Sequence, residues 1–125
     1  MTVTLLKSKL HRIKVTEAKL DYTGSLTIDE DLMDAVGMYN YEKLLVANVD
    51  NGERFETYAM RGPRGSGVCC LNGAAAHKGK VGDLLIVMTW AQVSESEANG
   101  FVPKVGIIGD GNRLWRKNPQ WNAGA

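Results

Sequence analysis

Apolar and polar residues alternate along most of the chain, a pattern that is typical of half-buried β-strands. In residues 9–18, for example, Leu10, Ile13 and Val15 are separated by polar, mainly basic, side chains. Residues 83–93 form the most apolar run, and we expect a central strand there. The strands predicted in this way cover residues 9–18, 42–49, 53–60, 67–73, 83–93 and 103–109.

Helical spacing of apolar residues appears in one clear place, residues 27–37. Thr27 and Glu30 are three residues apart and fit a capping box at the start of a helix. Gly37 can end the helix, because glycine readily adopts the left-handed conformation of a helix C-terminus. A second, smaller helical turn or loop is predicted over residues 74–79.

The order of these elements predicts a small, mainly β domain. Asp50, Asn51 and Gly52 separate two of the predicted strands, and such a sequence favours a tight hairpin turn. Six short strands with one or two short helices favour a closed barrel, since closure removes exposed sheet edges. Residues 111–125 lose the periodicity and are expected to be an extended or mobile tail. A length of 125 residues fits a single domain, residues 1–125.

The composition is that of an ordinary globular protein, with 44% hydrophobic and 23% charged residues. A net charge of +1 gives no overall attraction to nucleic acid or to an anionic membrane. Cys69 and Cys70 are adjacent and point to opposite faces of a strand, so we expect no disulfide between them. Reduced thiols and the lack of a signal-like or membrane-spanning apolar run predict a cytoplasmic protein. His11 and His77 are too isolated in the sequence to predict a metal site.

A basic cluster near the N-terminus is compatible with two functions. It contains Lys7, Lys9, His11, Arg12 and Lys14. On a regular strand the first three share one face, and the last two share the other. The cluster could bind an anionic small molecule, or it could bind nucleic acid as part of a non-catalytic small-barrel module. No aromatic residues are interleaved with it, which disfavours the nucleic-acid function.

The sequence contains two Gly-Ser pairs, Gly24-Ser25 and Gly65-Ser66. The second lies in a segment rich in glycine and proline, as in an ordinary surface loop. The first lies between a predicted strand and the predicted helix, with several hydroxyl-bearing side chains close to it in sequence. From the residues alone, either pair could be a simple turn.

Five short segments distinguish the first pair, because together they match one known pattern in order and in spacing. They are KLHR at 9–12, YTGS at 22–25, NVDNGERFETYA at 48–59, RGSG at 64–67, and NGAAAH followed by VGD between 72 and 83. In register, they resemble the bacterial aspartate decarboxylases, pyruvoyl enzymes that make β-alanine for pantothenate synthesis. The resemblance implies a six-stranded double-psi β-barrel with short helices. It also implies a homotetramer with active sites at the subunit interfaces.

The resemblance implies that the chain cuts itself between Gly24 and Ser25. The Ser25 hydroxyl would attack the carbonyl carbon of Gly24, and the peptide bond would become an ester. β-Elimination would then separate residues 1–24 from residues 25–125 and leave dehydroalanine, which hydrolyses to a pyruvoyl group at position 25. No metal or external cofactor would be needed. A maturation factor is a further candidate partner.

Two further residues are assigned to processing by the resemblance. A serine hydroxyl is a weak nucleophile, and a tetrahedral oxyanion needs preorganised donors. The resemblance implies that Thr57 assists the attack and the tetrahedral oxyanion, and that Asn72 binds the ester carbonyl. In catalysis, the pyruvoyl group would form a Schiff base with the amine of L-aspartate and accept the electrons released with CO2. Tyr58 is the implied proton donor.

L-Aspartate is a dianion, so we expect cationic anchors for its carboxylates. Arg54 is the first choice, because a guanidinium group can hold a carboxylate through two hydrogen bonds, and Lys9 is the second. The resemblance adds further substrate-binding residues, namely His11, Thr57, Gly73, Ala74 and Ala75.

The predicted strand conflicts with the assigned roles at one point. Alternation places Arg54 and Tyr58 on one face of the strand and Thr57 on the other, although Thr57 and Tyr58 would serve one site. A bulge, or contributions from two subunits, would resolve this conflict. The sequence also departs from the family pattern at Ala47, where family members often carry Trp, so we expect the packing there to differ.

Overall fold

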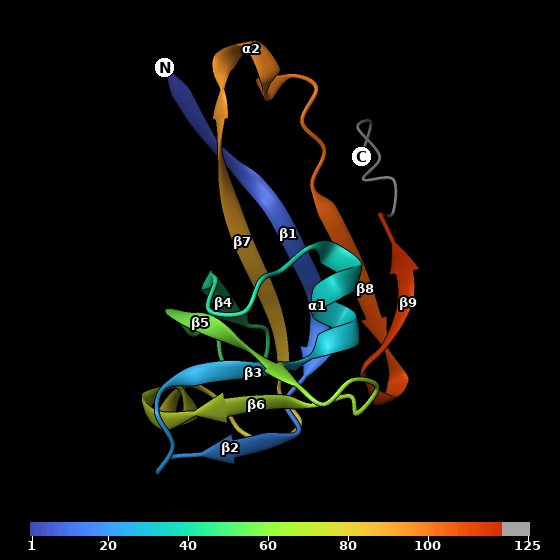
Figure 1. Ribbon diagram of the computed structural model, residues 1–125. Helices are drawn as coiled ribbons and strands as arrows, with labels where there is room; N and C mark the ends of the chain where they lie inside the picture. The colour runs from blue at the N-terminus through green and yellow to red at the C-terminus, as the bar shows by residue number, and fades with distance from the viewer. Residues whose placement is uncertain (119–125) are drawn as a thin grey trace.

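Nine strands form one mixed sheet in the computed structural model, which describes residues 1–118 (Figure 1). Their order is β2-β6-β3-β5-β4-β7-β1-β8-β9. Most pairs are antiparallel, but β1 with β8, β2 with β6 and β3 with β5 are parallel. The strands are β1 (Thr2–Lys14), β2 (Glu17–Lys19), β3 (Ser25–Asp29), β4 (Lys43–Asn48), β5 (Arg54–Gly62), β6 (Cys69–Asn72), β7 (Leu84–Ser94), β8 (Lys104–Gly109) and β9 (Arg113–Lys117).

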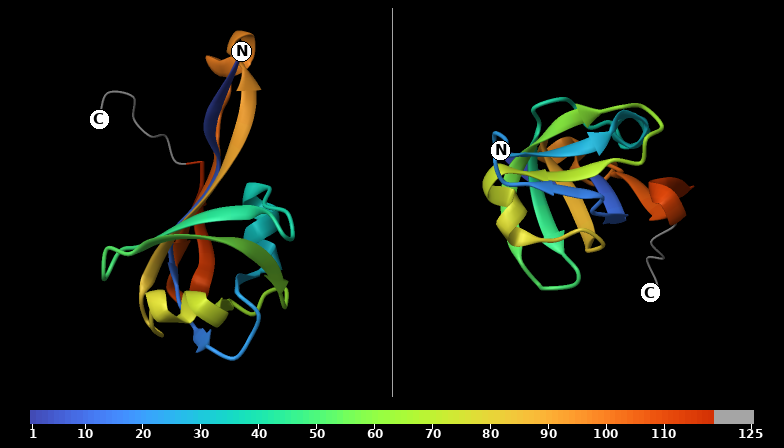
Figure 2. Two further views of the ribbon diagram at one scale, coloured as in Figure 1. Left: turned by 90° about the vertical axis from the view of Figure 1, so that its left-hand side faces the viewer. Right: turned by 90° about the horizontal axis from the view of Figure 1, so that it is seen from below.

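The sheet wraps around a single apolar core. The right-hand view of Figure 2 shows the strands from below. The prediction of a mainly β, barrel-like fold with short helices is confirmed. The six predicted strands correspond to β1 and β4–β8. The first of them, residues 9–18, joined the end of β1 to the start of β2, and β3 and β9 were missed. Within residues 1–118 the order does not return from β9 to β2, so the sheet is not closed. The largest fully buried side chains are Leu10, Ile13, Leu26, Ile28, Met33, Leu44, Leu71 and Leu85.

The helices are short, as predicted. They are α1 (Glu30–Val36), η1 (Gly73–Lys78), α2 (Glu95–Ala98) and η2 (Asp110–Asn112), where η marks a 3-10 helix. Among the described residues, no helix has the length and apolarity needed to cross a membrane. Strands β1 and β7 pair antiparallel over their whole length, and one end of this pair projects from the rest of the sheet, with α2 at its tip (Figures 1 and 2).

The predicted tail over residues 111–125 is only partly described by the structure. Its first part ends η2 and then forms β9, which pairs antiparallel with β8, so the chain there is an ordered strand of the sheet. The expectation of an extended or mobile tail from residue 119 onward lies outside the described residues.

The start of α1 differs from the prediction. Thr27 belongs to β3, where it lies opposite Met60 of β5, so the strand continues through residues that we expected to be helical. The cap is Asp29, whose Oδ1 accepts a hydrogen bond of 2.9 Å from the Asp31 amide. The predicted capping box of Thr27 and Glu30 is therefore wrong. Gly37 ends the helix in the left-handed conformation, with φ +72°, as predicted.

Two bulges in β1 change which basic side chains share a face. The register with β7 shifts between Leu6 and Ser8 and again between His11 and Ile13, where Arg12 has φ +70°. Ile13 is consequently buried, and the exposed Lys14 returns to the side that carries His11. The prediction that Lys14 lies on the face opposite His11 is wrong, because alternation counts only through an unbulged strand.

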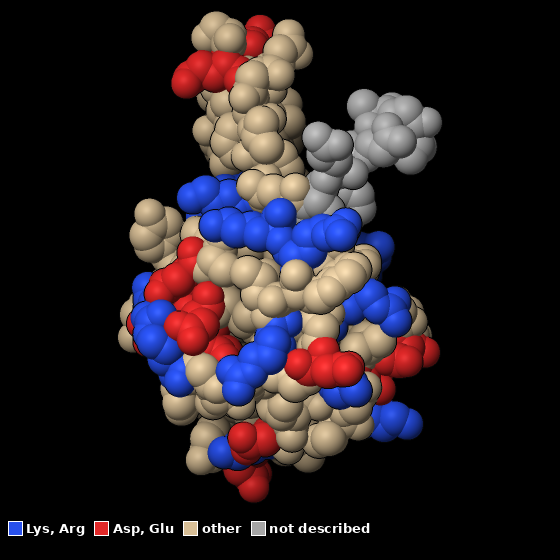
Figure 3. All heavy atoms as spheres, turned by 90° about the vertical axis from the view of Figure 1, so that its right-hand side faces the viewer, with Lys and Arg blue, Asp and Glu red and all other residues tan. Residues whose placement is uncertain are grey.

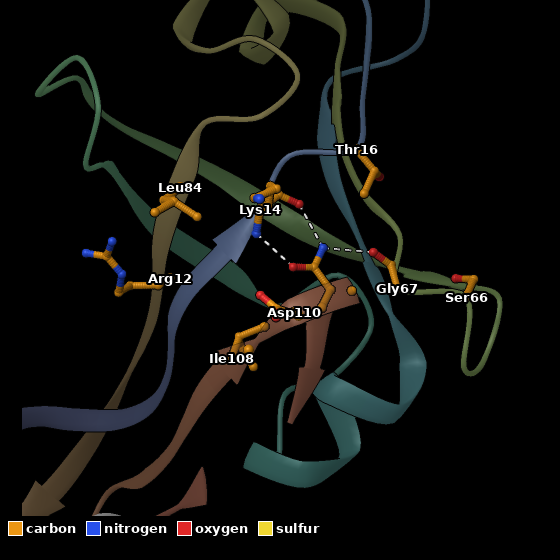
Figure 4. Close-up of a pocket in the computed structure, with 11 residues that line it drawn as sticks. Arg12, Lys14, Thr16, Ser66, Gly67, Leu84, Ile108 and Asp110 are labelled. Carbon is orange, nitrogen blue, oxygen red and sulfur yellow. Dashed lines mark hydrogen bonds between the residues drawn. The ribbon is translucent and has the colours of Figure 1, made fainter. Parts of the chain in front are cut away.

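A buried asparagine joins three segments at the lower end of β1. Asn112 Oδ1 accepts a hydrogen bond from the Lys14 amide at 2.9 Å, and its Nδ2 donates to the carbonyls of Lys14 and Gly67, both at 2.8 Å. These bonds form one wall of a pocket of about 450 Å³ (Figure 4). The pocket contains none of the predicted site residues. It is lined by Arg12, Lys14, Thr16, Ser66, Gly67, Leu84, Ile108, Gly109, Asp110, Gly111 and Asn112.

We predict that Asn112→Ala lowers the free energy of unfolding by about 2–3 kcal/mol, because it leaves buried backbone groups without partners. Asn118→Ala is the matched control. Asn118 also has positive φ and bonds a backbone amide, that of Val105, but it is exposed. Urea denaturation of both variants checks the prediction, and equal losses would contradict it.

Candidate active site

Ser25 lies at the first position of β3, directly after an exposed turn, and its side chain is buried. It lies opposite Asn72, the last residue of β6. Asn72 Nδ2 donates hydrogen bonds to Ser25 Oγ at 2.9 Å and to Thr27 Oγ1 at 2.8 Å. The strand pairing thus brings together two residues assigned to processing that are 47 positions apart in the chain. Thr27, predicted above as a helix cap, is thus a third member of this hydrogen-bonded group.

Gly73 allows the chain to pass close to the Gly24-Ser25 bond. It has φ +62°, and a Cβ atom there would lie 2.6 Å from the Tyr22 carbonyl oxygen. The same atom would lie 2.8 Å from both Cα and N of Gly24. Such distances are too short for any side chain, so residue 73 has to be glycine if the turn at residues 22–24 is to keep its place.

A surface pocket of about 370 Å³ adjoins this turn. It brings together five residues that were predicted to serve the site or its processing, namely Gly24, Thr57, Tyr58, Ala74 and Ala75. Phe55, Glu56 and Lys78 also line it and were missed. Lys78 follows Ala75 at a spacing of three in η1, and residues three apart share a face of a 3-10 helix, so this spacing could have indicated it.

The conflict between Thr57 and Tyr58 is explained by the free edge of β5. Residues 54–58 pair with β4 in a continuous register, so no bulge is present there. Pairing with β3 begins only at Ala59. Within the described chain, the second edge of residues 54–58 therefore carries no strand, and η1 lies nearby. Side chains from both faces of a strand can reach a pocket at its edge, and those of Phe55 to Tyr58 do so.

The three predicted anchors Lys9, His11 and Arg54 do not line this pocket. They lie on the outward face of the sheet, where His11 is opposite Ile86, Ile86 is opposite Ala47, and Ala47 is opposite Arg54. Three strand spacings separate His11 from Arg54, or about 14 Å. One chain therefore does not place these three residues at its own pocket.

His11 differs from the other two anchors in its charge. Burial lowers the pKa of its imidazole, and the positive charges of Lys9 and Arg12 lower it further. His11 is consequently neutral near pH 7 in this chain, where it can donate or accept a hydrogen bond. The positive charge beside it comes from Lys9 and Arg12. Among residues 1–118 no three His, Cys, Asp or Glu side chains are grouped so that they could hold a metal ion.

Taken together, the fold and this constellation define a small β-barrel-like protein with a buried, hydrogen-bonded serine beside a pocket. A sequence model of the family described as aspartate decarboxylase matches residues 1–115. The chain is 54% identical over 114 residues to the aspartate 1-decarboxylase of Ralstonia pickettii, covering 91% of this chain and 95% of that protein. It is 53% identical over 111 residues to that of Shouchella clausii, covering 89% and 87%. It is 51% identical over 117 residues to that of Lactiplantibacillus plantarum, covering 94% and 90%. The chain belongs to the aspartate decarboxylase family, which confirms the resemblance.

We predict that Gly73→Ala lowers the free energy of unfolding by about 3 kcal/mol or more, since a Cβ would collide with backbone that cannot move freely. Gly52→Ala is the control for backbone strain alone. Gly52 has φ +77°, but a Cβ there would meet nothing within 4 Å, so we expect a loss of about 1 kcal/mol. Thermal or urea unfolding of both variants checks the difference, and similar losses would contradict the close approach.

Proposed function

We propose that the protein decarboxylates L-aspartate to β-alanine and CO2, and that it first cuts itself between Gly24 and Ser25. The β-alanine would serve pantothenate and coenzyme A synthesis. The observation that supports this most directly is the hydrogen bond from Asn72 to Ser25 Oγ, beside a pocket that Gly24 lines. Membership of the aspartate decarboxylase family supports the substrate and the reaction.

In the proposed processing reaction, Ser25 Oγ bonds to the carbonyl carbon of Gly24 while the peptide C–N bond breaks and the amine of residue 25 takes up a proton. β-Elimination then removes the Cα proton of residue 25 and breaks its Cβ–Oγ bond. In the elimination, negative charge develops on Oγ as its bond to Cβ breaks, and the Asn72 amide already donates to that atom. Thr57 lines the pocket next to Gly24, which fits its assigned part in processing.

The surroundings of residue 25 fit a pyruvoyl group. Gly73 packs on the turn without a side chain, and Ala74 and Ala75 add little bulk to the pocket. When present, the group supplies a ketone that binds the substrate amine and accepts electrons as CO2 leaves. Tyr58 lines the pocket and is 37% exposed, so its hydroxyl can deliver a proton there, the role that we propose for it.

We propose that Lys9, His11 and Arg54 act on substrate bound at the pocket of a neighbouring subunit in a homotetramer. Their face of the sheet also carries half-buried apolar side chains, which an assembly would cover. Two facts support this arrangement: the three residues share one face, and one chain does not bring them to its own pocket. The apolar residues are Leu45, Ala47, Ile86 and Met88.

The alternative, a nucleic-acid-binding module, is not favoured by the family. The basic cluster is also interrupted, because Lys7 forms an ion pair of 2.7 Å with Glu42. On the face that carries β8 and β9, Lys and Arg side chains form a band below the projecting end of β1 and β7, but acidic groups lie close beneath it (Figure 3). Arg61 and Arg64 are likewise paired, because they form an ion-pair network with acids of α1.

We predict that intact-mass spectrometry of the purified protein finds two fragments, residues 1–24 and 25–125, with the second one lacking its free amine. Ser25→Ala should stay at the mass of the whole chain and lose CO2 release from aspartate by at least about a thousandfold. Cleavage that persists in Ser25→Ala would contradict the role of Ser25. Cleavage that requires a cell extract would identify a need for a maturation factor.

Complementation between two inactive variants tests the shared site. Lys9→Ala chains should cleave but turn over aspartate about a hundredfold more slowly, because a carboxylate loses its cationic partner. Coexpressed with Ser25→Ala chains, they should regain about a quarter of native turnover, since some interfaces then pair an intact Ser25 with an intact Lys9. Lys14→Ala, which removes a cation from the same strand, is the control and should behave as native. No gain on mixing would place Lys9 and Ser25 of one chain in one site.

A further inference from the structure

Strand β6 carries two polar side chains that meet beside Ser25. Cys70 and Asn72 are two positions apart and therefore share a face of the strand. Cys70 Sγ donates a hydrogen bond of 3.1 Å to Asn72 Oδ1. Both residues are only 4% exposed. The thiol thus touches the one polar atom of the Asn72 amide that does not face Ser25 and Thr27.

The two ends of an asparagine amide have almost the same shape, so their hydrogen-bond partners decide which way the amide points. In the observed orientation, the two hydrogens of Nδ2 meet Ser25 Oγ and Thr27 Oγ1, and Oδ1 receives the thiol. A flipped amide would place Nδ2 against Cys70 Sγ, a weak acceptor, and Oδ1 against both hydroxyl groups.

We propose that Cys70 is a positioning residue for self-processing, because its thiol holds the Asn72 amide with Nδ2 directed at Ser25 Oγ. The effect on self-processing rests on the proposed function, whereas the hydrogen bonds of Cys70 and Asn72 do not depend on it. With Nδ2 in place, the site stabilises the negative charge that develops on Oγ when it leaves Cβ. With the amide flipped, Oδ1 would repel that charge.

The thiol is suited to this task because it keeps its proton. Burial raises the pKa of Cys70 above its ordinary value, and the nearby carboxylate of Glu17 raises it further, while Lys19 lowers it. Cys70 is therefore a neutral donor near pH 7. A thiolate could not donate, and it would repel Oδ1. The neighbouring thiol of Cys69 belongs to the apolar core on the opposite face of the strand, which provides a matched control.

The experiment compares Cys70→Ser, which keeps a donor, with Cys70→Ala and Cys70→Val, which do not, and with Cys69→Ala as the packing control. The rate at which fragment 25–125 appears is followed by intact mass. We expect Cys70→Ser to remain within about threefold of native and Cys70→Ala to be about tenfold slower, the effect of one lost hydrogen bond. Cys69→Ala should lose thermal stability but cleave at the native rate. Native-like cleavage of Cys70→Ala, or equal slowing of the Ser and Ala variants, would overturn the proposal.

A second measurement separates this inference from the proposed function. In the uncut Ser25→Ala protein, where Thr27 still accepts from Nδ2, the side-chain amide of Asn72 is followed by ¹⁵N NMR. We expect Cys70→Ala to shift its signals and speed its hydrogen exchange, and Cys70→Ser to restore both. Unchanged amide signals in Cys70→Ala would overturn the positioning role even if the chain cleaves. Failure of native protein to cleave, with the amide signals shifting as expected, would instead count against the proposed function alone.

Discussion

The hydrogen bond from Asn72 to Ser25 is the interaction on which the candidate site depends. It exists because β6 and β3 pair antiparallel in a register that places these residues opposite each other. The neighbouring pair in the ladder, Leu26 and Leu71, is fully buried in the core, so a slip of one residue would bury polar side chains in their place. Core packing therefore sets the position of the serine hydroxyl.

The buried polar side chains of β3 and β6 at this site form hydrogen bonds with one another. Ser25, Thr27, Cys70 and Asn72 bond to one another at the end of two strands, where each group would be costly to bury alone. A connected set of this kind is stiff, because moving one member leaves the others without partners. Stiffness is useful where a weak nucleophile has to be held against a particular carbonyl.

The free edge of β5 and the outward face of the sheet divide the remaining site residues into two groups. Gly24, Thr57 and Tyr58 meet at the edge, because no strand of the described chain covers β5 before Ala59. Lys9 and Arg54 lie on the outward face of the sheet. Lys9 is on β1 and Arg54 is on β5, and strands β7 and β4 lie between them. Two copies of the chain could complete a site from these two groups, and the geometry of a single chain does not do so.

Periodicity was sufficient to predict the long strands, the hairpin at Gly52 and the end of α1 at Gly37, because each follows from local chemistry. It failed where tertiary pairing overrides local preference. Thr27 has good capping neighbours, yet pairing with β5 keeps it in a strand. Lys14 changes face through a bulge that only the register with β7 reveals. The site residues came from the resemblance, since neither spacing nor composition relates Ser25 to Asn72 across 47 positions.

Strand β6 also explains how the chain can be cut beside Ser25 without unfolding. On one side β6 pairs with β2, where Lys19 lies opposite Asn72, and on the other it pairs with β3, where Ser25 lies opposite the same residue. The segments before and after the Gly24-Ser25 bond are thus hydrogen-bonded independently to one strand. Breaking that bond would release only the turn between them, which carries exposed residues, while both flanking strands stay in the sheet. The barrel can therefore tolerate the loss of a covalent bond at the one place where the proposed chemistry requires it.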